Sequence, residues 1–126
     1  MNTGSYNIST MSKVVYDALS GISKNIFLFD RPKSYDNMEE FIVVDFPNRL
    51  YDNIGYGATK CVIELYAKER ASGPNMPLLS SLQEKVYEKL PIENDLYKIH
   101  FPVSQIMGSD GLGFFSMSIY CNVFIK

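Results

Sequence analysis

The fold is decided by residues 57–90, which read GATKCVIELYAKERASGPNMPLLSSLQEKVYEKL. From Ala58 to Glu69 apolar and polar side chains alternate, and this period of two predicts a long, half-buried strand. Its inward positions are Cys61, Ile63, Leu65 and Ala67. Val62 and Tyr66 interrupt the polar face, so we expect that face to be partly covered as well.

After Ala71–Asn75 the pattern changes to the period of an amphipathic helix. The apolar residues at three- and four-residue spacing are Leu78, Leu79, Leu82, Val86 and Leu90. Asn75 suits the N-cap, and Pro77 suits the first turn, where a missing N–H costs little. Pro91 ends the helix because it cannot continue the hydrogen-bond ladder. The sequence therefore predicts a helix from Met76 to Leu90 whose apolar stripe packs on the sheet.

The chain before this stretch predicts one helix and two strands. The helix has Ser9 or Thr10 as its N-cap and ends at about Ser20. Its apolar face consists of Met11, Val14, Val15, Ala18 and Leu19. Strands are expected within Asn25–Asp30 and Phe41–Phe46. Because the apolar residues of the first strand are consecutive, either both of its faces are covered or one face meets another subunit.

The chain after the central stretch predicts an antiparallel hairpin. Apolar residues alternate from Tyr97 to Val103 and again from Phe115 to Ile125, with the glycine-rich turn Gly108–Gly113 before the second strand. Pro102 lacks an N–H group, so its strand is an edge strand or carries a bulge. The complete order, α-β-β-β-α-β-β, predicts an α+β domain. Two helices are expected to pack on one face of a mainly antiparallel sheet of about five strands.

The composition limits the kind of protein. The 126 residues fit one domain with residues 1–8 as a flexible lead-in, and 46% hydrophobic residues exclude a disordered chain. No apolar run reaches the length of a membrane span, so no membrane partner is expected. A formal charge of −2 predicts no sequence-specific nucleic-acid binding. Met1–Ser5 lacks the basic and apolar regions of a signal peptide, which predicts synthesis in the cytoplasm.

No set of residues in the sequence has the pattern of a catalytic site. His100 is the single histidine and lies on the polar side of its strand. A Ser-His-Asp set would need Ser116 or Ser118 to converge on it, and no nucleophile-elbow glycine pattern marks either serine. Gly108–Gly113 leads into a strand rather than a helix, so it predicts a turn and not a phosphate loop. We therefore expect no enzymatic activity and no cofactor.

The two cysteines, Cys61 and Cys121, fall on the inward faces of predicted strands. In a cytoplasmic protein we expect both to be buried free thiols. A disulfide would require them to face each other across neighbouring strands at the right Cα separation. Two cysteines and one histidine make a poor zinc-binding set, so no metal site is expected.

Six segments, taken in order, have the pattern of a known family. They are the helix Thr10–Ser20, the strand Asn25–Pro32, the apolar strand Phe41–Val44, the long strand Lys60–Ala67, the helix opening Met76–Leu79 and the C-terminal hairpin. This chain resembles the tail-terminator and neck (tail-completion) proteins of long-tailed bacteriophages, and the likeness covers nearly all of it. The tip between Val103 and Gly113 departs from the family's usual look because it carries apolar Ile106 and Met107.

The resemblance implies a non-enzymatic structural subunit of the virion, made in the host cytoplasm. Such subunits form a ring, commonly a hexamer, and their partners are further copies, the tail tube and the head-connector proteins. Ring contacts are heterologous, so each subunit needs two different adhesive patches. Our candidates for contacts between copies are Ile26, Phe27, Phe29, Leu50, Tyr51, Ile54 and Tyr56. Our candidates for contacts with the tube or neck are Ile106, Met107 and Leu112.

Two alternatives stay open at this point. The aromatic loop Leu50–Tyr56 either folds back on its own core or docks on a neighbour. The chain also fits a protein of another class, a small-molecule-binding or enzymatic α+β domain with a pocket between sheet and helix. Convergent polar groups in a deep concavity, with strongly shifted pKa values, would indicate that class. A ring with an open channel would indicate the structural subunit.

Overall fold

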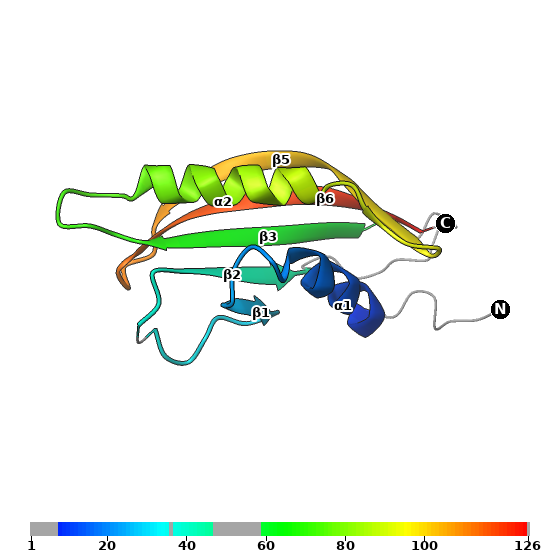
Figure 1. The fold of residues 1–126 in the computed structure, drawn as a ribbon, viewed down its shortest axis with the longest axis horizontal. Helices are drawn as coiled ribbons and strands as arrows, with labels where there is room; N and C mark the ends of the chain where they lie inside the picture. Colours follow the sequence, from blue (N-terminus) through cyan, green and yellow to red (C-terminus); the bar gives the residue numbers. More distant parts are fainter. Residues whose placement is uncertain (1–7, 36, 47–58, 126) are drawn as a thin grey trace.

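The computed structural model of the chain describes residues 8–35, 37–46 and 59–125 (Figure 1). Its elements are α1 (Ile8–Leu19), β1 (Ile26–Leu28), β2 (Glu40–Asp45), β3 (Thr59–Lys68), α2 (Met76–Lys89), β4 (Ile92–Glu93), β5 (Tyr97–Ser109) and β6 (Phe114–Ile125). The strands form one sheet in the order β1-β2-β3-β6-β5-β4. Neighbouring strands are antiparallel except for β1 and β2, which are parallel. The predicted α+β class is confirmed, with one strand more than expected.

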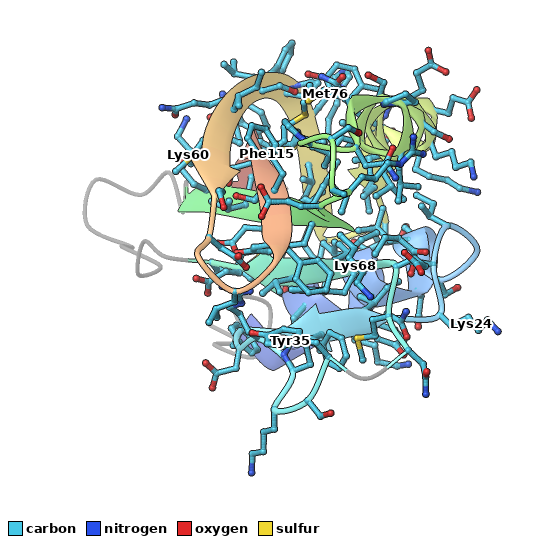
Figure 2. All side chains as sticks on the ribbon, turned by 90° about the vertical axis from the view of Figure 1, so that its left-hand side faces the viewer. Lys24, Tyr35, Lys60, Lys68, Met76 and Phe115 are labelled. Atoms are coloured by element: carbon cyan, nitrogen blue, oxygen red, sulfur yellow. The ribbon has the colours of Figure 1, made fainter. Side chains whose placement is uncertain are left out.

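The sheet is curled around the two helices. α1 contacts β1 and β2 at one end of the strand order and also contacts β4 at the other end. One helix can touch both ends only because the sheet bends them toward each other, so its shape is that of a half-barrel. Figure 2 shows this bend from the side, with α2 seen nearly end-on and the β5–β6 hairpin curving past it.

β3 is the strand through which the two halves of the sheet are joined. It pairs with β2 along one side and with β6 along the other. The register places Leu65 between Ile42 of β2 and Met117 of β6, and all three side chains are buried. The alternation that predicted this strand is therefore confirmed, because its inward positions do face the core.

α2 begins and ends almost where the sequence predicts. The side-chain oxygen of Asn75 accepts a hydrogen bond of 3.3 Å from the N–H of Leu78, which confirms the N-cap. Pro77 lies in the first turn, where no partner for its nitrogen is needed. The helix ends at Lys89, and Leu90 has extended backbone as the C-cap, so the predicted end was one residue too late.

The main core fills the space between the helices and the inward face of the sheet. The helices contribute Met11, Val15, Leu19, Leu79, Leu82 and Val86, all buried. The two central strands contribute Cys61, Ile63, Leu65, Ala67, Met117, Ile119, Cys121 and Val123. Burial of apolar area on this scale supplies most of the stabilisation of a small domain, so both helices are held by packing on the sheet.

A second, smaller cluster covers part of the opposite face of the sheet. It consists of Phe41, Val43, Tyr66 and Phe114, with Phe27, Tyr35 and Met38 packed against them. The rings of Phe41 and Tyr66 are stacked with centroids 4.3 Å apart. This aromatic cluster confirms that the outer face of β3 is partly covered. In β1, Ile26 lies in the main core and Phe27 packs against this cluster, so both faces of the strand contact the rest of the chain.

The structure differs from the predicted elements at the ends of α1 and β5 and in one additional strand, β4. α1 starts at Ile8, earlier than a Ser9 or Thr10 cap allows. β4 is two residues long and therefore shows no periodicity that a sequence pattern could reveal. β5 continues to Ser109, beyond the predicted end at Val103. Among the described residues, neither helix has the length and apolarity needed to cross a membrane.

Candidate functional site

The most exposed apolar side chains of the described residues gather on one hairpin. They are Phe101 (56% exposed), Val103 (65%), Ile106 (56%), Met107 (53%) and Leu112 (59%). All belong to β5 or to the turn that follows it, and we call them the apolar hairpin surface. Scattered exposed apolar residues are normal, whereas larger exposed apolar patches are common where proteins contact other molecules. The tip candidates Ile106, Met107 and Leu112 all belong to it.

Two bulges shape this surface. The pairing of β5 with β6 shifts register between His100 and Val103 and again between Ile106 and Gly108. Each shift adds one residue to β5, and such an insertion bends a strand and re-aims its side chains. At the first bulge Phe101 has φ of 60°, and its ring packs edge-on against Phe124 at a centroid distance of 5.9 Å. Of the two alternatives that Pro102 raised, an edge strand or a bulge, the bulge is therefore present.

The same part of β5 is also an edge of the sheet. β4 pairs only with Lys98 and Ile99, so among the described residues no strand lies on the outer side of β5 from Phe101 to Ser109. That segment, Phe101-Pro102-Val103-Ser104-Gln105-Ile106-Met107-Gly108-Ser109, contains no charged residue. Proteins commonly place charged side chains on an exposed edge to prevent unwanted pairing, and this edge has none.

α2 is fixed beside this edge by hydrogen bonds to a single serine. Gln83 Nε2 donates to Ser104 Oγ at 2.8 Å, and the hydroxyl of Tyr87 lies 2.7 Å from the same Oγ. An open groove of about 360 Å³ runs along this flank of α2, lined by Gln83, Glu84, Tyr87 and Glu88. Neither glutamate forms an ion pair with any residue that the structure describes.

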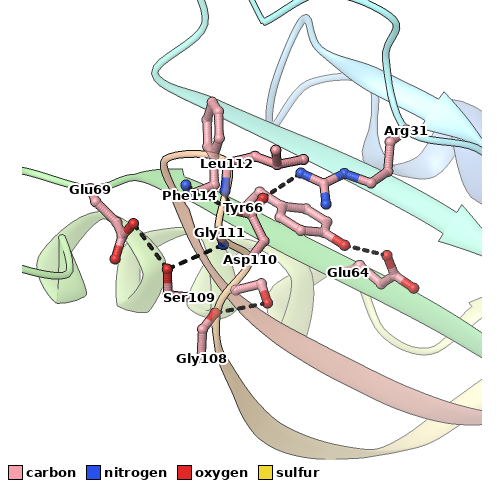
Figure 3. Close-up of polar contacts among 11 residues, drawn as sticks. Arg31, Glu64, Tyr66, Glu69, Gly108, Ser109, Asp110, Gly111, Leu112 and Phe114 are labelled. Atoms are coloured by element: carbon pink, nitrogen blue, oxygen red, sulfur yellow. Dashed lines mark hydrogen bonds and ion pairs between the residues drawn. The ribbon is translucent and has the colours of Figure 1, made fainter.

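The turn at the end of the hairpin is organised by Asp110 (Figure 3). Its Oδ1 accepts hydrogen bonds from the N–H of Leu112 at 2.7 Å and from the N–H of Phe114 at 3.0 Å. Its Oδ2 forms an ion pair with Arg31, which reaches across from the segment between β1 and β2. The Asp110 side chain is nearly buried, whereas Gly111 and Gly113 adopt positive φ to complete the turn.

Arg31 lies over the aromatic cluster of the outer face. Its guanidinium carbon is 4.6 Å from the ring centroid of Tyr66 and 5.3 Å from that of Tyr35, distances at which a cation is attracted to a ring face. Burial alone would raise the pKa of Asp110, but the hydrogen bonds from Leu112, Arg31 and Phe114 outweigh it and lower that pKa. The pair therefore stays ionised and anchors the hairpin tip to the outer face of the sheet.

Two more contacts fix the surroundings of this anchor. The Tyr66 hydroxyl donates a hydrogen bond of 2.7 Å to Glu64 Oε1. Burial, together with this bond to a carboxylate, raises the pKa of Tyr66, so the hydroxyl remains protonated. Ser109 Oγ donates to Glu69 Oε1 at 3.1 Å, which joins the end of β5 to the segment just after β3.

The predicted contact residues of β1 fall in different environments. Ile26 is buried in the main core, whereas Phe27 is partly buried and packs against the outer aromatic cluster. Phe29 is 44% exposed, with its ring 6.4 Å from that of Phe46. Leu50, Tyr51, Ile54 and Tyr56 lie outside the described residues.

The chemistry-bearing residues do not converge. His100 lies opposite Asn122, whereas Ser118 lies opposite Gln105 and Ser116 opposite Gly108. In the part of the chain that the structure describes, no three metal-ligating side chains gather. Cys61 and Cys121 are buried free thiols, and burial raises the pKa of each. The polar side chains of α2 that contact β5 are instead Gln83 and Tyr87, which both bond to Ser104.

No family model matches the chain, and no curated protein is significantly similar to it. The resemblance to phage tail-terminator and neck proteins therefore stays a prediction. What the structure adds is the hairpin surface. The apolar residues near the glycine-rich turn indicate this surface in the sequence. The two bulges and the unpaired edge of β5 have no sequence signal other than Pro102.

Proposed function

We propose that this protein is a structural subunit of a long-tailed phage virion, which forms a ring that closes the tail tube or joins the tail to the head. The observation that supports this best is the apolar hairpin surface. Five large apolar side chains, each more than half exposed, lie on one hairpin. A chain that works alone in water gains nothing from such a surface, whereas an assembly subunit covers it with a neighbour.

The geometry of the hairpin also fits a fixed contact rather than a moving one. Asp110 and Arg31 anchor the tip to the outer face of the sheet, and Ser104 holds the strand against α2. A pre-ordered surface loses little conformational entropy on binding. The hairpin thus suits the contact with the tube or neck, and a second patch is required for contacts between copies.

Phe29 is the described residue that suits the second patch. It follows β1 at the opposite edge of the sheet from β5, and 44% of it is exposed. The two surfaces lie on different strands, as a head-to-tail ring requires. Buried apolar side chains of the main core pack between the sheet and the helices, which supports a contact surface rather than a pocket as the functional feature.

Light scattering and negative-stain images of the purified chain test the proposal. We expect the mass of a closed oligomer, commonly six copies, and ring-shaped particles with an open channel. Phe29→Asp should lower the mass and leave the fold intact, because φ of 72° at this position is tolerated by aspartate. Leu112→Asp is the matched control and should keep the ring. A monomer at high concentration would overturn the proposal.

A further inference from the structure

We propose that the edge of β5 at Val103–Ile106, together with the groove beside α2, binds an extended segment of another protein by strand addition. The bound segment carries apolar side chains that alternate with lysine or arginine. The inference rests on the proposed function, because it names the chemistry of the partner that the hairpin surface contacts. Strand addition is a general mode of peptide recognition, in which main-chain hydrogen bonds give affinity and alternate side chains give specificity.

The first argument is the main chain of β5. Val103–Ile106 lies between the two register shifts and pairs regularly with β6. On its other side it has no strand neighbour among the described residues, since β4 reaches only Lys98 and Ile99. Alternate residues of a strand direct their N–H and C=O groups to opposite sides. Half of these main-chain groups are therefore without a strand partner, and an added strand supplies one.

The second argument is the distribution of apolar side chains on both faces of this edge. Val103 lies opposite Tyr120, on the outer face of the sheet, and Ile106 lies opposite Met117, on the side of the helices. More than half of each side chain is exposed. A strand that joins this edge therefore finds an apolar neighbour above and below the sheet, and its own apolar residues gain contact on both faces.

The third argument is charge. Glu84 and Glu88 line the groove beside the edge and form no ion pair with a described residue. In a helix with 3.6 residues per turn, Lys85 and Lys89 lie on the flank away from Gln83 and Tyr87. Gln83 and Tyr87 contact β5, and Glu84 and Glu88 follow them about 100° further round the helix on the outer wall of the groove, where a basic side chain of the added strand complements them.

Charge also argues against a second copy of this chain at the same edge. Two copies joined through β5 would form one continuous sheet and bring two acidic α2 flanks to a shared seam. Like charges placed across an interface oppose association. A different polypeptide with basic residues has no such cost, so we assign the edge to another protein of the assembly.

Fluorescence anisotropy with the full-length chain tests this inference. The first probe is a fluorescein-labelled ten-residue peptide of alternating lysine and valine, and the second has glutamate in place of each lysine. We expect the lysine peptide to bind and the glutamate peptide to bind much more weakly. Two further lysine peptides are N-methylated at alternate main-chain nitrogens, in the two possible registers. Because an added strand directs only alternate N–H groups to β5, one of them should lose binding and the other should keep it.

Two variants and a control locate the site. Glu84→Gln with Glu88→Gln should weaken binding of the lysine peptide by about two- to tenfold, as expected for two exposed ion pairs. Ile106→Lys should weaken it by about tenfold through lost apolar contact. Glu39→Gln with Asp95→Asn changes the net charge equally at exposed positions away from the groove and should leave binding unchanged.

Four outcomes would overturn the inference. The first is that the lysine and glutamate peptides bind equally well, or that neither binds. The second is that both N-methylated peptides still bind, and the third is that the Glu84/Glu88 and Glu39/Asp95 double variants have the same effect on binding. The fourth is that the Ile106→Lys protein has a changed oligomer mass in the absence of peptide. The last outcome would place a second copy at the edge. A ring without peptide binding removes this inference alone, whereas a monomer that binds the lysine peptide removes only the ring.

Discussion

Cys61 lies directly opposite Cys121 across the β3–β6 pair, and both thiols are buried and reduced. A disulfide requires two cysteines that face each other on neighbouring strands, and the register of β3 and β6 places the two residues in this way. The thiols are nevertheless shielded, because burial raises both pKa values and the thiolate is the reactive form.

The first prediction concerns these thiols. In the native protein at pH 8 we expect an aromatic disulfide reagent to modify Cys61 and Cys121 far more slowly than it modifies the unfolded chain. Modification should follow the opening of the β3–β6 pair, so its rate should fall as the fold is stabilised. Rapid labelling of both thiols without loss of structure would contradict the buried positions.

The second prediction concerns Asp110 and pH. Its folded pKa is lowered, so the ionised form stabilises the fold above the unfolded pKa of about 4, and this contribution is lost as pH falls through the folded value. Asp110→Asn should reduce the free energy of unfolding at pH 7 by about 1–2 kcal/mol. It should also flatten the loss of stability between about pH 5 and pH 2. Urea titrations at several pH values, with Asp95→Asn as the control, measure both effects.

The third prediction concerns the start of α2. Asn75→Ala removes the acceptor for the N–H of Leu78 and should lower the free energy of unfolding by about 1 kcal/mol. Asn75→Asp keeps an acceptor at the same place and should restore most of that loss. If both variants unfold at the same urea concentration as the parent, the cap contributes nothing to stability.

The fourth prediction concerns the apolar hairpin surface. Met107→Ser with Leu112→Ser removes two exposed side chains and should change the free energy of unfolding by less than about 0.5 kcal/mol. It should also reduce binding of a hydrophobic dye to the native protein. Leu82→Ala, in the main core, should instead cost about 2–5 kcal/mol. A large loss of stability in the hairpin variant would mean that these side chains support the fold.

Most of the fold follows from periodicity in the sequence. Apolar side chains recur with a period of two in β3 and β6 and with a period of 3.6 in α2. These periods predict which face of each element is buried, and the buried faces form the main core. The bulges of β5 do not follow, since an inserted residue breaks the period without a composition of its own. Pro102 marks one of them only because it cannot donate to a ladder.

The candidate site is less visible in the sequence than the fold. Ile106, Met107 and Leu112 stand out as apolar residues around a turn, and their exposure agrees with that reading. Ile26 and Phe27 stay predictions as contacts between copies, and the structure adds that β1 packs against a cluster on each of its faces. Arg31 and Asp110 are far apart in the chain, and no local pattern signals that they meet.

The position of β6 in the middle of the sheet has a consequence for biosynthesis. β3 emerges from the ribosome well before β6, and until β6 arrives one long side of β3 has no strand to pair with. A nascent chain paused before Phe114 would therefore expose a long alternating strand with a bare edge, the kind of intermediate that aggregates or recruits chaperones. Completion of the sheet thus waits for the synthesis of β6, and rare codons placed just ahead of β6 should lower the yield of soluble protein.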